Sequence, residues 1–526
     1  MKFAILTFCS SLLGVLTLGE QFSNPVLWED LADNDVFRVD DVYYYTASTM
    51  HYSPGAPILQ SYDLVNWEYI GHAVPNLPWG NKYNLQGGNA YVKGIFASTM
   101  RYRASNKQFY WIGCIEYSRT YVYTSTSVTN TWNPRSEINT CYYDCGLLID
   151  DDDTMYVAYG NTQISVAQLS VDGLSQVKTQ VVYNTPSSIG TLEGSRMYKI
   201  KGVYYIFSTK PANGQYVLQS SSGPFGPYTI KELLLNIGSP IPSGGVPHQG
   251  SLVETQNGTW YYMAFVDSYP GGRMPVLAPI TWGSDGFPVI TLVSGAWGSS
   301  YNYPLAPRVL ESHTGTDSFQ GTSLGAQWEW NHNPDTTKFT VNNGLILSAA
   351  TVTSDLYSAR NTLTHRIIGP TSSGTIILDY SKMKDGDRAG FVLLRDTSAW
   401  IGVVNNGGTF RVSMWSGLTM SSTWATASTG AEVKGVTISG GKVWLRIHAD
   451  IHVGTGKQGT FYYSTDGSAF TALGSLTLNS AWNFFLGYRY GIFNFATKAL
   501  GGSVAVISFT MDSPGSTTTE STITQS

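Results

Sequence analysis

Hydrophobic positions in the first 270 residues come in short bursts of tyrosine, tryptophan and β-branched residues, each preceded by a polar or glycine turn. The centres of successive bursts lie about 45 to 65 residues apart, the length of a unit of four short strands. This repeat predicts a β-propeller, whose blades are arranged around a central channel. Five copies predict five blades, with bursts at residues 40–45, 106–111, 152–157, 201–206 and 257–262.

The pattern changes beyond residue 310. Residues 311–317 are polar, and from Ser318 short runs alternate apolar and polar positions between glycine-rich turns, as in a two-sheet β-sandwich. We therefore expect an all-β chain with a five-bladed propeller over residues 20–310, a linker over 311–317 and a sandwich over 318–512. One continuous large β-fold is the alternative. The clearest expected sandwich strands are residues 375–379, 390–394, 409–412 and 442–447.

Composition adds a ligand class to this picture. Of 526 residues, 42% are hydrophobic and only 13% are charged, and the formal net charge is −5. A chain of this length is expected to form at least two domains. The absence of any lysine and arginine cluster argues against a nucleic-acid partner. Aromatic rings stack on the C–H faces of sugar rings, so an aromatic-rich and weakly charged chain favours a neutral carbohydrate ligand.

Both ends of the chain carry processing signals. Lys2 precedes a short apolar run, which predicts a secretory signal peptide over residues 1–19. The run is too short for a membrane anchor and is interrupted by Ser10 and Ser11, so we expect a secreted, extracellular protein without a membrane partner. The serine- and threonine-rich residues 513–526 cannot bury a core and predict a disordered tail.

Secretion bears on the cysteines and on one asparagine. Beyond the signal peptide the chain has Cys114, Cys141 and Cys145, so we expect one disulfide and one buried free thiol, with the pairing left open. Asn257 begins an Asn-Gly-Thr sequence in an expected hairpin turn. This is an acceptor sequence for N-glycosylation, and we expect Asn257 to face solvent.

Three acidic residues occupy equivalent places in the repeat. Asp33, Asp144 and Glu193 each come roughly ten residues before a burst, at the start of the first, third and fourth blades. Equivalent places in a radial repeat converge on its axis, so these carboxyls are expected to meet. Hydrolysis of a glycosidic bond needs a general acid and a general base, and a nearby carboxylate can raise the pKa of the acid. Taken singly, each residue also suits a turn or a cap.

Several short segments carry a family resemblance: residues 24–25, 61–67, 192–194, 247–250 and 272–277. In content and order they resemble signatures of glycoside hydrolase family 43, whose members are five-bladed propellers that cleave arabinosyl and xylosyl linkages with inversion. The second domain resembles the concanavalin-like sandwich of some subfamilies, through residues 358–364 and 385–390. Residues 28–35 and 48–58 resemble fungal arabinofuranosidases that act on doubly substituted xylose units of arabinoxylan.

The resemblance assigns roles to the three acids. It implies that Asp33 is the general base that activates water and that Glu193 is the general acid. Asp144 is then the residue that raises the pKa of Glu193 and orients it. Asp35 is an alternative base, although Asp33 is the residue aligned with the family's first aspartate. Asn34 and Cys145 stand where the family commonly has proline after an aspartate.

Other candidate site residues have two interpretations each. Phe96, where the family often has tryptophan, is either an aromatic platform for a sugar or a core residue. Arg273 either binds sugar hydroxyls or forms a surface ion pair, and His51 is a candidate for the pocket rim. The resemblance places His248 in the channel near a bound ion that it contacts through water, and a hydrogen-bonded core histidine is the alternative. From the second domain, residues 490–495 are expected over the channel mouth.

The implied activity is that of a secreted, inverting glycoside hydrolase that releases L-arabinose from arabinoxylan and its oligosaccharides. The resemblance specifies an exo-acting α-L-arabinofuranosidase for α-1,3-linked arabinose on doubly substituted xylose. A β-xylosidase of the same family and a non-catalytic carbohydrate-binding propeller are the alternatives. We expect a monomer that requires no cofactor, with a structural calcium ion in the channel as the one metal considered.

Overall fold

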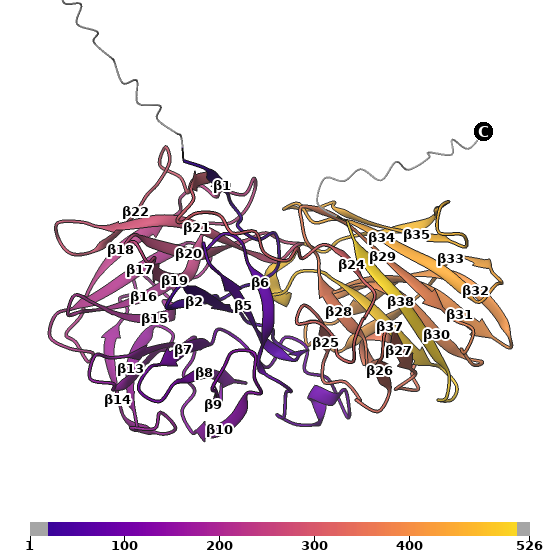
Figure 1. The fold of residues 1–526 in the computed structure, drawn as a ribbon, viewed down its shortest axis with the longest axis horizontal. Helices are drawn as coiled ribbons and strands as arrows, with labels where there is room; N and C mark the ends of the chain where they lie inside the picture. Colours follow the sequence, from indigo (N-terminus) through magenta and orange to yellow (C-terminus); the bar gives the residue numbers. More distant parts are fainter. Residues whose placement is uncertain (1–18, 513–526) are drawn as a thin grey trace, which may run out of the picture.

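The computed structural model describes residues 19–512, and nearly all regular structure in this range is β-strand. Figure 1 shows two β-rich halves side by side, a propeller formed by the first 300 residues and a sandwich formed by the last 200. The predicted five-bladed propeller followed by a β-sandwich is confirmed. The predicted signal peptide (1–19) and tail (513–526) lie, apart from residue 19, outside the described residues.

The propeller consists of five four-stranded antiparallel sheets. Blade 1 contains β2 (Asp35–Val39), β3 (Val42–Thr46), β5 (Gly55–Ser61) and β6 (Glu68–Val74). Blade 2 contains β7 (Thr99–Arg103), β8 (Gln108–Ile115), β9 (Arg119–Ser125) and β10 (Asn133–Ile138). Blade 3 contains β11 (Gly146–Ile149), β12 (Met155–Tyr159), β13 (Gln163–Leu169) and β14 (Gln176–Asn184).

Blade 4 contains β15 (Glu193–Ile200), β16 (Val203–Lys210), β17 (Gly214–Ser220) and β18 (Thr229–Leu235). Blade 5 contains β19 (His248–Glu254), β20 (Trp260–Asp267), β21 (Arg273–Trp282) and β22 (Pro288–Ile290). The first strands of the blades touch in the order β2, β7, β11, β15, β19 and back to β2, which closes the ring. A separate pair, β1 (Gln21–Ser23) with β23 (Ser300–Asn302), joins the start of the described chain to the segment after blade 5.

Side-chain alternation explains how the blades pack. Successive residues of a strand point to opposite faces of its sheet. In β11 and β12, Leu147 and Val157 pack toward blade 2, whereas Leu148 and Ala158 pack toward blade 4. Each blade is therefore apolar on both faces, and its short strands read as aromatic and aliphatic bursts in the sequence.

The sandwich consists of two eight-stranded sheets. One contains, in spatial order, β26 (Phe339–Val341), β27 (Leu345–Ser348), β38 (Ser503–Met511), β29 (Thr371–Asp379), β34 (Lys442–Asp450), β35 (Gln458–Ser464) and β36 (Thr471–Thr477), with β24 (Gly315–Asp317) beside β38. The other contains β33 (Thr426–Thr437), β32 (Thr409–Met420), β31 (Thr397–Asn406), β30 (Asp387–Leu394), β37 (Arg489–Ala496), β28 (Leu363–Arg366), β25 (Glu329–Asn331) and β4 (Tyr52–Ser53).

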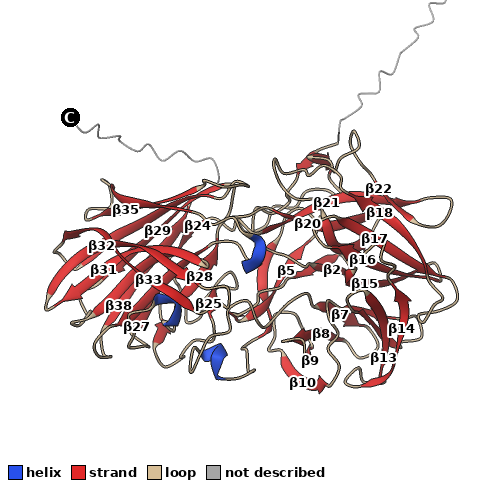
Figure 2. Ribbon diagram, turned by 180° about the vertical axis from the view of Figure 1, so that it is seen from behind, coloured by secondary structure: helices blue, strands red, loops and turns tan. Residues whose placement is uncertain are grey.

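All four strands expected from the sandwich sequence lie within observed strands. Three short 3-10 helices punctuate residues 19–512, at η1 (Asn81–Asn84), η2 (Leu356–Ser358) and η3 (Trp482–Phe484), and are the blue segments of Figure 2. None of the helices in this range is long and apolar enough to cross a membrane. Part of the expected linker, residues 315–317, is strand β24, so that segment belongs structurally to the sandwich sheet.

The two halves share a sheet. Strand β4 leaves blade 1 between β3 and β5 and pairs with β25, with Ser53 opposite Trp330. Next to this pair, the fully buried carboxylate of Glu329 binds Arg366, Arg489 and, at 3.1 Å, His72 of the propeller. Burial alone would raise the pKa of Glu329, but the two arginines hold it well below its ordinary value. Glu329, Arg366 and Arg489 all belong to the sandwich, and the contact of Glu329 with His72 reaches across to the propeller.

The cysteine expectation is confirmed and its open pairing is resolved. Cys114 and Cys141 form a disulfide, and Cys145 is a buried free thiol. Asn257 is exposed in the turn between β19 and β20, as expected for an accessible acceptor sequence. The disulfide between Cys114 and Cys141 joins the end of β8 to the segment that leads into blade 3.

Candidate active site

The starts of three inner strands bring the three predicted acids to one cavity of about 510 Å³. Asp33 and Asp144 each lie two residues before an inner strand, β2 and β11, and Glu193 is the first residue of β15. Asp33 and Asp144 have positive φ values of 55° and 48°, a left-handed conformation that aspartate tolerates better than most residues. These local turns aim both carboxyls at the channel mouth, where Glu193 joins them.

The Asp33 carboxylate is held by two donors. Ser48 donates its hydroxyl to Oδ2 at 2.7 Å, and Arg273 donates from Nη1 to Oδ1 at 2.8 Å. Arg273 is only 7% exposed and its partner is the buried carboxyl of Asp33, so the alternative of a surface ion pair is wrong. Binding of sugar hydroxyls by Arg273 stays a prediction. Its remaining nitrogens approach the carbonyl oxygen of Phe485 at 3.1 Å and Ser48 at 3.5 Å.

The pKa values of Glu193 and Asp144 are both raised above their ordinary values. Glu193 Oε2 accepts hydrogen bonds from the Tyr143 hydroxyl at 3.0 Å and from Asn161 at 2.8 Å. Burial raises the pKa of Glu193 despite these bonds, and the charge of Asp33 adds to the effect. Burial and the charges of Glu193 and Asp33 raise the pKa of Asp144 well above its ordinary value. The two raised pKa values favour the protonated forms of these carboxyls relative to an isolated carboxyl.

Arg196, which the sequence analysis did not identify, holds the acids through their backbones. Its guanidinium is fully buried and donates to the carbonyl oxygens of Asp33 at 2.7 Å, Asn34 at 3.0 Å and Ser98 at 2.7 Å, and also to that of Cys145. One side chain of blade 4 thus binds blades 1, 2 and 3 below the cavity. The signal was present in the sequence as an arginine three residues after Glu193 in an apolar inner strand.

Asp35, the alternative base, does not line the cavity. It is fully buried and accepts bonds from Thr99 at 2.6 Å, the Met100 amide at 3.0 Å and Arg101 at 2.7 Å. Burial would raise the pKa of Asp35, but the charges of Arg101 and Arg196 lower it. Its role in this arrangement is to join blade 1 to blade 2.

Aromatic rings form one wall of the cavity. Phe96 and Tyr117 stack at 5.1 Å, and Tyr117 and Tyr143 stack at 5.8 Å. Phe96 lines the cavity as expected, but one of its faces is covered by Tyr117, so it presents less surface than a free platform would. Since Tyr143 also binds Glu193, this stack connects the wall to the acid pair.

The sandwich contributes the opposite part of the cavity through Trp482 and Phe485, in and next to η3. Trp482 is 65% exposed, an unusual state for tryptophan away from a binding surface. The expectation for residues 490–495 is wrong, because they are buried inside β37 and pair with β28 and β30. The segment that reaches the propeller lies just before that strand.

The two predicted histidines differ in position. His248 lines the cavity, and its ring nitrogens lie 3.2 Å from Thr209 and from Asp267. The rim position predicted for His51 is wrong: His51 is fully buried, against the rings of Tyr52, Tyr91 and His332. The reason is strand β4, which draws this segment under the sandwich instead of leaving it at the mouth.

Both ring nitrogens of His248 have hydrogen-bond partners, so the ring has no free nitrogen to bind an ion directly, and the water-mediated ion stays a prediction. Within residues 19–512, no group of three or more histidine, cysteine, aspartate or glutamate side chains is arranged to hold a metal. The side chains that the cavity offers are the Asp33 carboxyl paired with Arg273 and the two carboxyls of raised pKa, Glu193 and Asp144.

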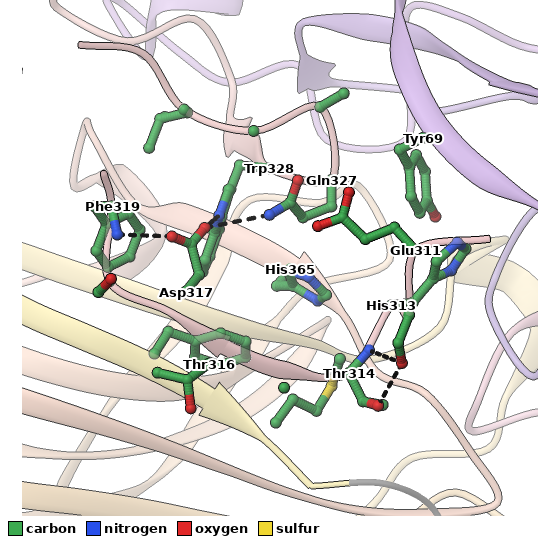
Figure 3. A pocket seen from close by; sticks show the side chains of 18 of the residues that line it. Tyr69, Glu311, His313, Thr314, Thr316, Asp317, Phe319, Gln327, Trp328 and His365 are labelled. Carbon is green, nitrogen blue, oxygen red and sulfur yellow. Dashed lines mark hydrogen bonds between the residues drawn. The ribbon is translucent and has the colours of Figure 1, made fainter. Parts of the chain in front are cut away.

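A second hollow, of about 490 Å³, lies where β6, β24 and β38 meet. In Figure 3 its central carboxylate, Asp317, accepts bonds from the Phe319 amide, Gln327 and Trp328, at 2.7, 3.2 and 2.8 Å. These bonds hold the turn after β24. Asp33, Asp144 and Glu193, the three predicted acids, all line the first cavity. We therefore take the first cavity as the candidate active site.

Comparisons with known proteins agree with this geometry. Residues 22–288 match the model of glycosyl hydrolases family 43, and residues 316–511 match that of the β-xylosidase C-terminal concanavalin A-like domain. A β-xylosidase of Formosa agariphila is 29% identical, over 94% of this chain and 90% of its own length. A non-reducing end α-L-arabinofuranosidase of Bacteroides ovatus is 30% identical, over 60% of this chain and 61% of its own.

One solved structure is more similar. It is 49% identical with a TM-score of 0.91, and the match covers 94% of this chain and 100% of that one. That protein is described as a family 43 glycoside hydrolase whose engineered active site displays both endo-xylanase and exo-arabinofuranosidase activity. Both halves of the present chain thus have counterparts of known fold.

Proposed function

The chain belongs to glycosyl hydrolase family 43, and on that premise we propose that it is an exo-acting, inverting α-L-arabinofuranosidase. Its proposed substrate is arabinoxylan, with its oligosaccharides, and its product is L-arabinose. The proposed linkage is α-1,3, on xylose units that carry two arabinose substituents. The family membership makes the chain a glycoside hydrolase, and the choice of sugar and linkage is the proposal.

The observation that carries the proposal is the arrangement of three carboxyls in one cavity. Asp33 is paired with Arg273. Burial and the charge of Asp33 raise the pKa of Glu193, and burial with the charges of Glu193 and Asp33 raises the pKa of Asp144. A cavity of about 510 Å³, with aromatic walls from both domains, suits a terminal sugar unit better than an open cleft would. The likeness to the engineered family 43 enzyme with exo-arabinofuranosidase activity supports arabinose as that unit.

In the proposed reaction, Asp33 accepts a proton from a water molecule as the water oxygen bonds to the anomeric carbon. Glu193 gives its proton to the glycosidic oxygen, whose bond to the anomeric carbon breaks. Attack from the face opposite the leaving group inverts the anomeric configuration. Asp144, through its charge, keeps Glu193 protonated before the bond breaks. Arg273 and Ser48 keep the base oriented.

A β-xylosidase is the second candidate, favoured by the similarity to the Formosa agariphila enzyme along 94% of the chain. It would use the same acids and differ in the sugar that the pocket accepts. Chromatography of the monosaccharides released from arabinoxylan oligosaccharides separates the two. Arabinose as the product supports the proposal, and xylose from the non-reducing end overturns it. A non-catalytic carbohydrate-binding propeller would release neither sugar.

We also propose that the enzyme is secreted, N-glycosylated and monomeric. The apolar N-terminal sequence supports secretion, and the exposed turn at Asn257 supports N-glycosylation there. We propose a monomer, because each chain supplies both walls of its own cavity. Mass spectrometry of secreted protein, before and after removal of N-glycans, tests the cleavage site and Asn257, and light scattering tests the oligomeric state.

A further inference from the structure

We infer that Asp30 is a positioning residue for the proposed reaction, because its one carboxylate joins the loop that carries Arg273 to the sandwich loop that carries Phe485. Asp30 is 4% exposed and does not line the cavity. Its Oδ1 accepts the backbone N–H of Arg273 at 2.9 Å, and its Oδ2 accepts that of Gly487 at 2.9 Å. The donors come from different domains. This role rests on the proposed function.

The loops that Asp30 joins meet again at the cavity. Tyr269 and Arg273 of blade 5 both donate to the carbonyl oxygen of Phe485, each at 3.1 Å. Arg273 also binds Asp33 at 2.8 Å. A displacement of the Arg273 backbone would therefore move the partner of the base and one aromatic wall together. A third tie comes from Arg366 of the sandwich, which donates to the Asp30 carbonyl oxygen at 2.9 Å.

The local packing leaves little room for another arrangement. A Cβ on Gly272, which has a φ of +110°, would lie 2.4 Å from the Asp30 carboxyl. A Cβ on Gly487 would lie 1.9 Å from the carbonyl oxygen of Gly271. The three chain segments thus touch through backbone and one carboxylate. Both oxygens of the Asp30 carboxylate accept a backbone N–H. An amide in its place would turn its NH₂ group toward one of those N–H groups and lose that hydrogen bond.

The test compares Asp30→Asn and Asp30→Ala with a matched control, Asp63→Ala, in the full-length protein. Asp63 is also fully buried and also joins distant segments, accepting the Val65 and Arg308 amides at 2.9 and 2.8 Å, but it does not line the cavity. Each variant is assayed well below its unfolding temperature for kcat and KM on an arabinoside. Hydrogen–deuterium exchange is followed at the Arg273 and Gly487 amides.

We expect both Asp30 variants to lose about 10²-fold in kcat/KM, chiefly in kcat, with the alanine variant the more affected. Exchange at the two amides should accelerate about tenfold or more in Asp30→Ala. Asp63→Ala should lose stability while keeping its kcat and the protection of those amides. Gly272→Ala, which crowds the carboxyl directly, should reproduce the loss of kcat.

Two results for Asp30→Ala would overturn the inference. One is an unchanged exchange rate at the Arg273 and Gly487 amides, and the other is a wild-type kcat although these amides exchange faster. The exchange measurement needs no substrate, so it separates this inference from the proposed function. If the wild type releases xylose instead of arabinose, the arabinofuranosidase proposal fails, while the same comparison of kcat on xylosides still decides the role of Asp30.

Discussion

Arg273 and Asp33 are 240 residues apart in the chain, yet their guanidinium and carboxylate meet at 2.8 Å in the cavity. The closing of the propeller ring makes this possible, because blade 5 adjoins blade 1. The contact gives Asp33 a fixed orientation and a cation beside it, which distinguishes it from the carboxyl pair across the cavity. The fold therefore gives the proposed base and the proposed acid different surroundings.

Asp33→Asn should reduce kcat by about 10²–10⁴-fold, because an amide cannot accept the proton of the attacking water. The neighbouring Asp35→Asn should instead destabilise the fold by about 3–5 kcal/mol, since it leaves Arg101 and Arg196 without their buried partner. Kinetics and chemical denaturation of both variants check this contrast. A folded Asp33→Asn enzyme with wild-type kcat would remove Asp33 from the mechanism.

Glu193→Gln should reduce hydrolysis of arabinoxylan oligosaccharides by about 10²–10⁴-fold, because the leaving oxygen then departs without a proton. An aryl arabinoside with an acidic phenol needs little protonation, so its kcat should fall far less. Steady-state kinetics on the two substrates give the comparison. Equal losses on both would indicate that Glu193 does not act as the general acid.

Asp144→Asn should shift the alkaline limb of the kcat/KM profile to lower pH, and kcat should fall about tenfold or more. The neighbouring charge is lost, so Glu193 gives up its proton more readily. A pH–rate profile of both proteins measures the shift. An unmoved alkaline limb would mean that Asp144 does not tune the acid.

The same variant has a stability consequence with a definite sign. Burial and like charge raise the pKa of Asp144, so the folded state binds a proton more tightly than the unfolded state. Stability is then lost as pH rises from the ordinary value of 3.8 through the raised one. Asp144→Asn should therefore be more stable than wild type at neutral pH, and the difference should vanish below pH 3.8 in thermal unfolding.

Replacing Cys114 and Cys141 by serine should lower stability by about 3 kcal/mol, since their disulfide closes a loop with a sequence separation of 27. Cys145→Ala serves as the control for loss of a cysteine near Asp144.

Burial raises the pKa of Cys145 to about 12, so thiol reagents should leave this residue unmodified in the folded enzyme. Denaturant titration and mass spectrometry measure the two effects; an unaltered unfolding midpoint in the serine variant would contradict the first.

The propeller and the meeting of its acids could be predicted because they follow from local sequence. A burst of aromatics marks a blade, and Asp33, Asp144 and Glu193 stand at equivalent places before three bursts. Radial symmetry then converts sequence position into spatial position. The strand expectations for the sandwich succeeded for a similar reason, since alternation is a property of each strand alone.

The errors concern contacts between distant segments. The pairing of Tyr52 with Asn331 places His51 under the sandwich. No local sequence pattern predicts this pairing. Trp482 and Phe485 reach the cavity only because the domains dock, and the contact of Glu329 with His72 across this junction is equally non-local. Arg196 stands in the sequence three residues after Glu193, but its four carbonyl partners on other blades could not be predicted.

The most direct test of the proposed function is proton NMR of a doubly substituted arabinoxylan oligosaccharide during digestion. The account predicts that the anomeric signal of the α-1,3-linked arabinose disappears first, while β-L-arabinofuranose, the inverted anomer, appears before mutarotation. Release of xylose with the arabinosyl signals intact, or first appearance of the α anomer, would contradict it.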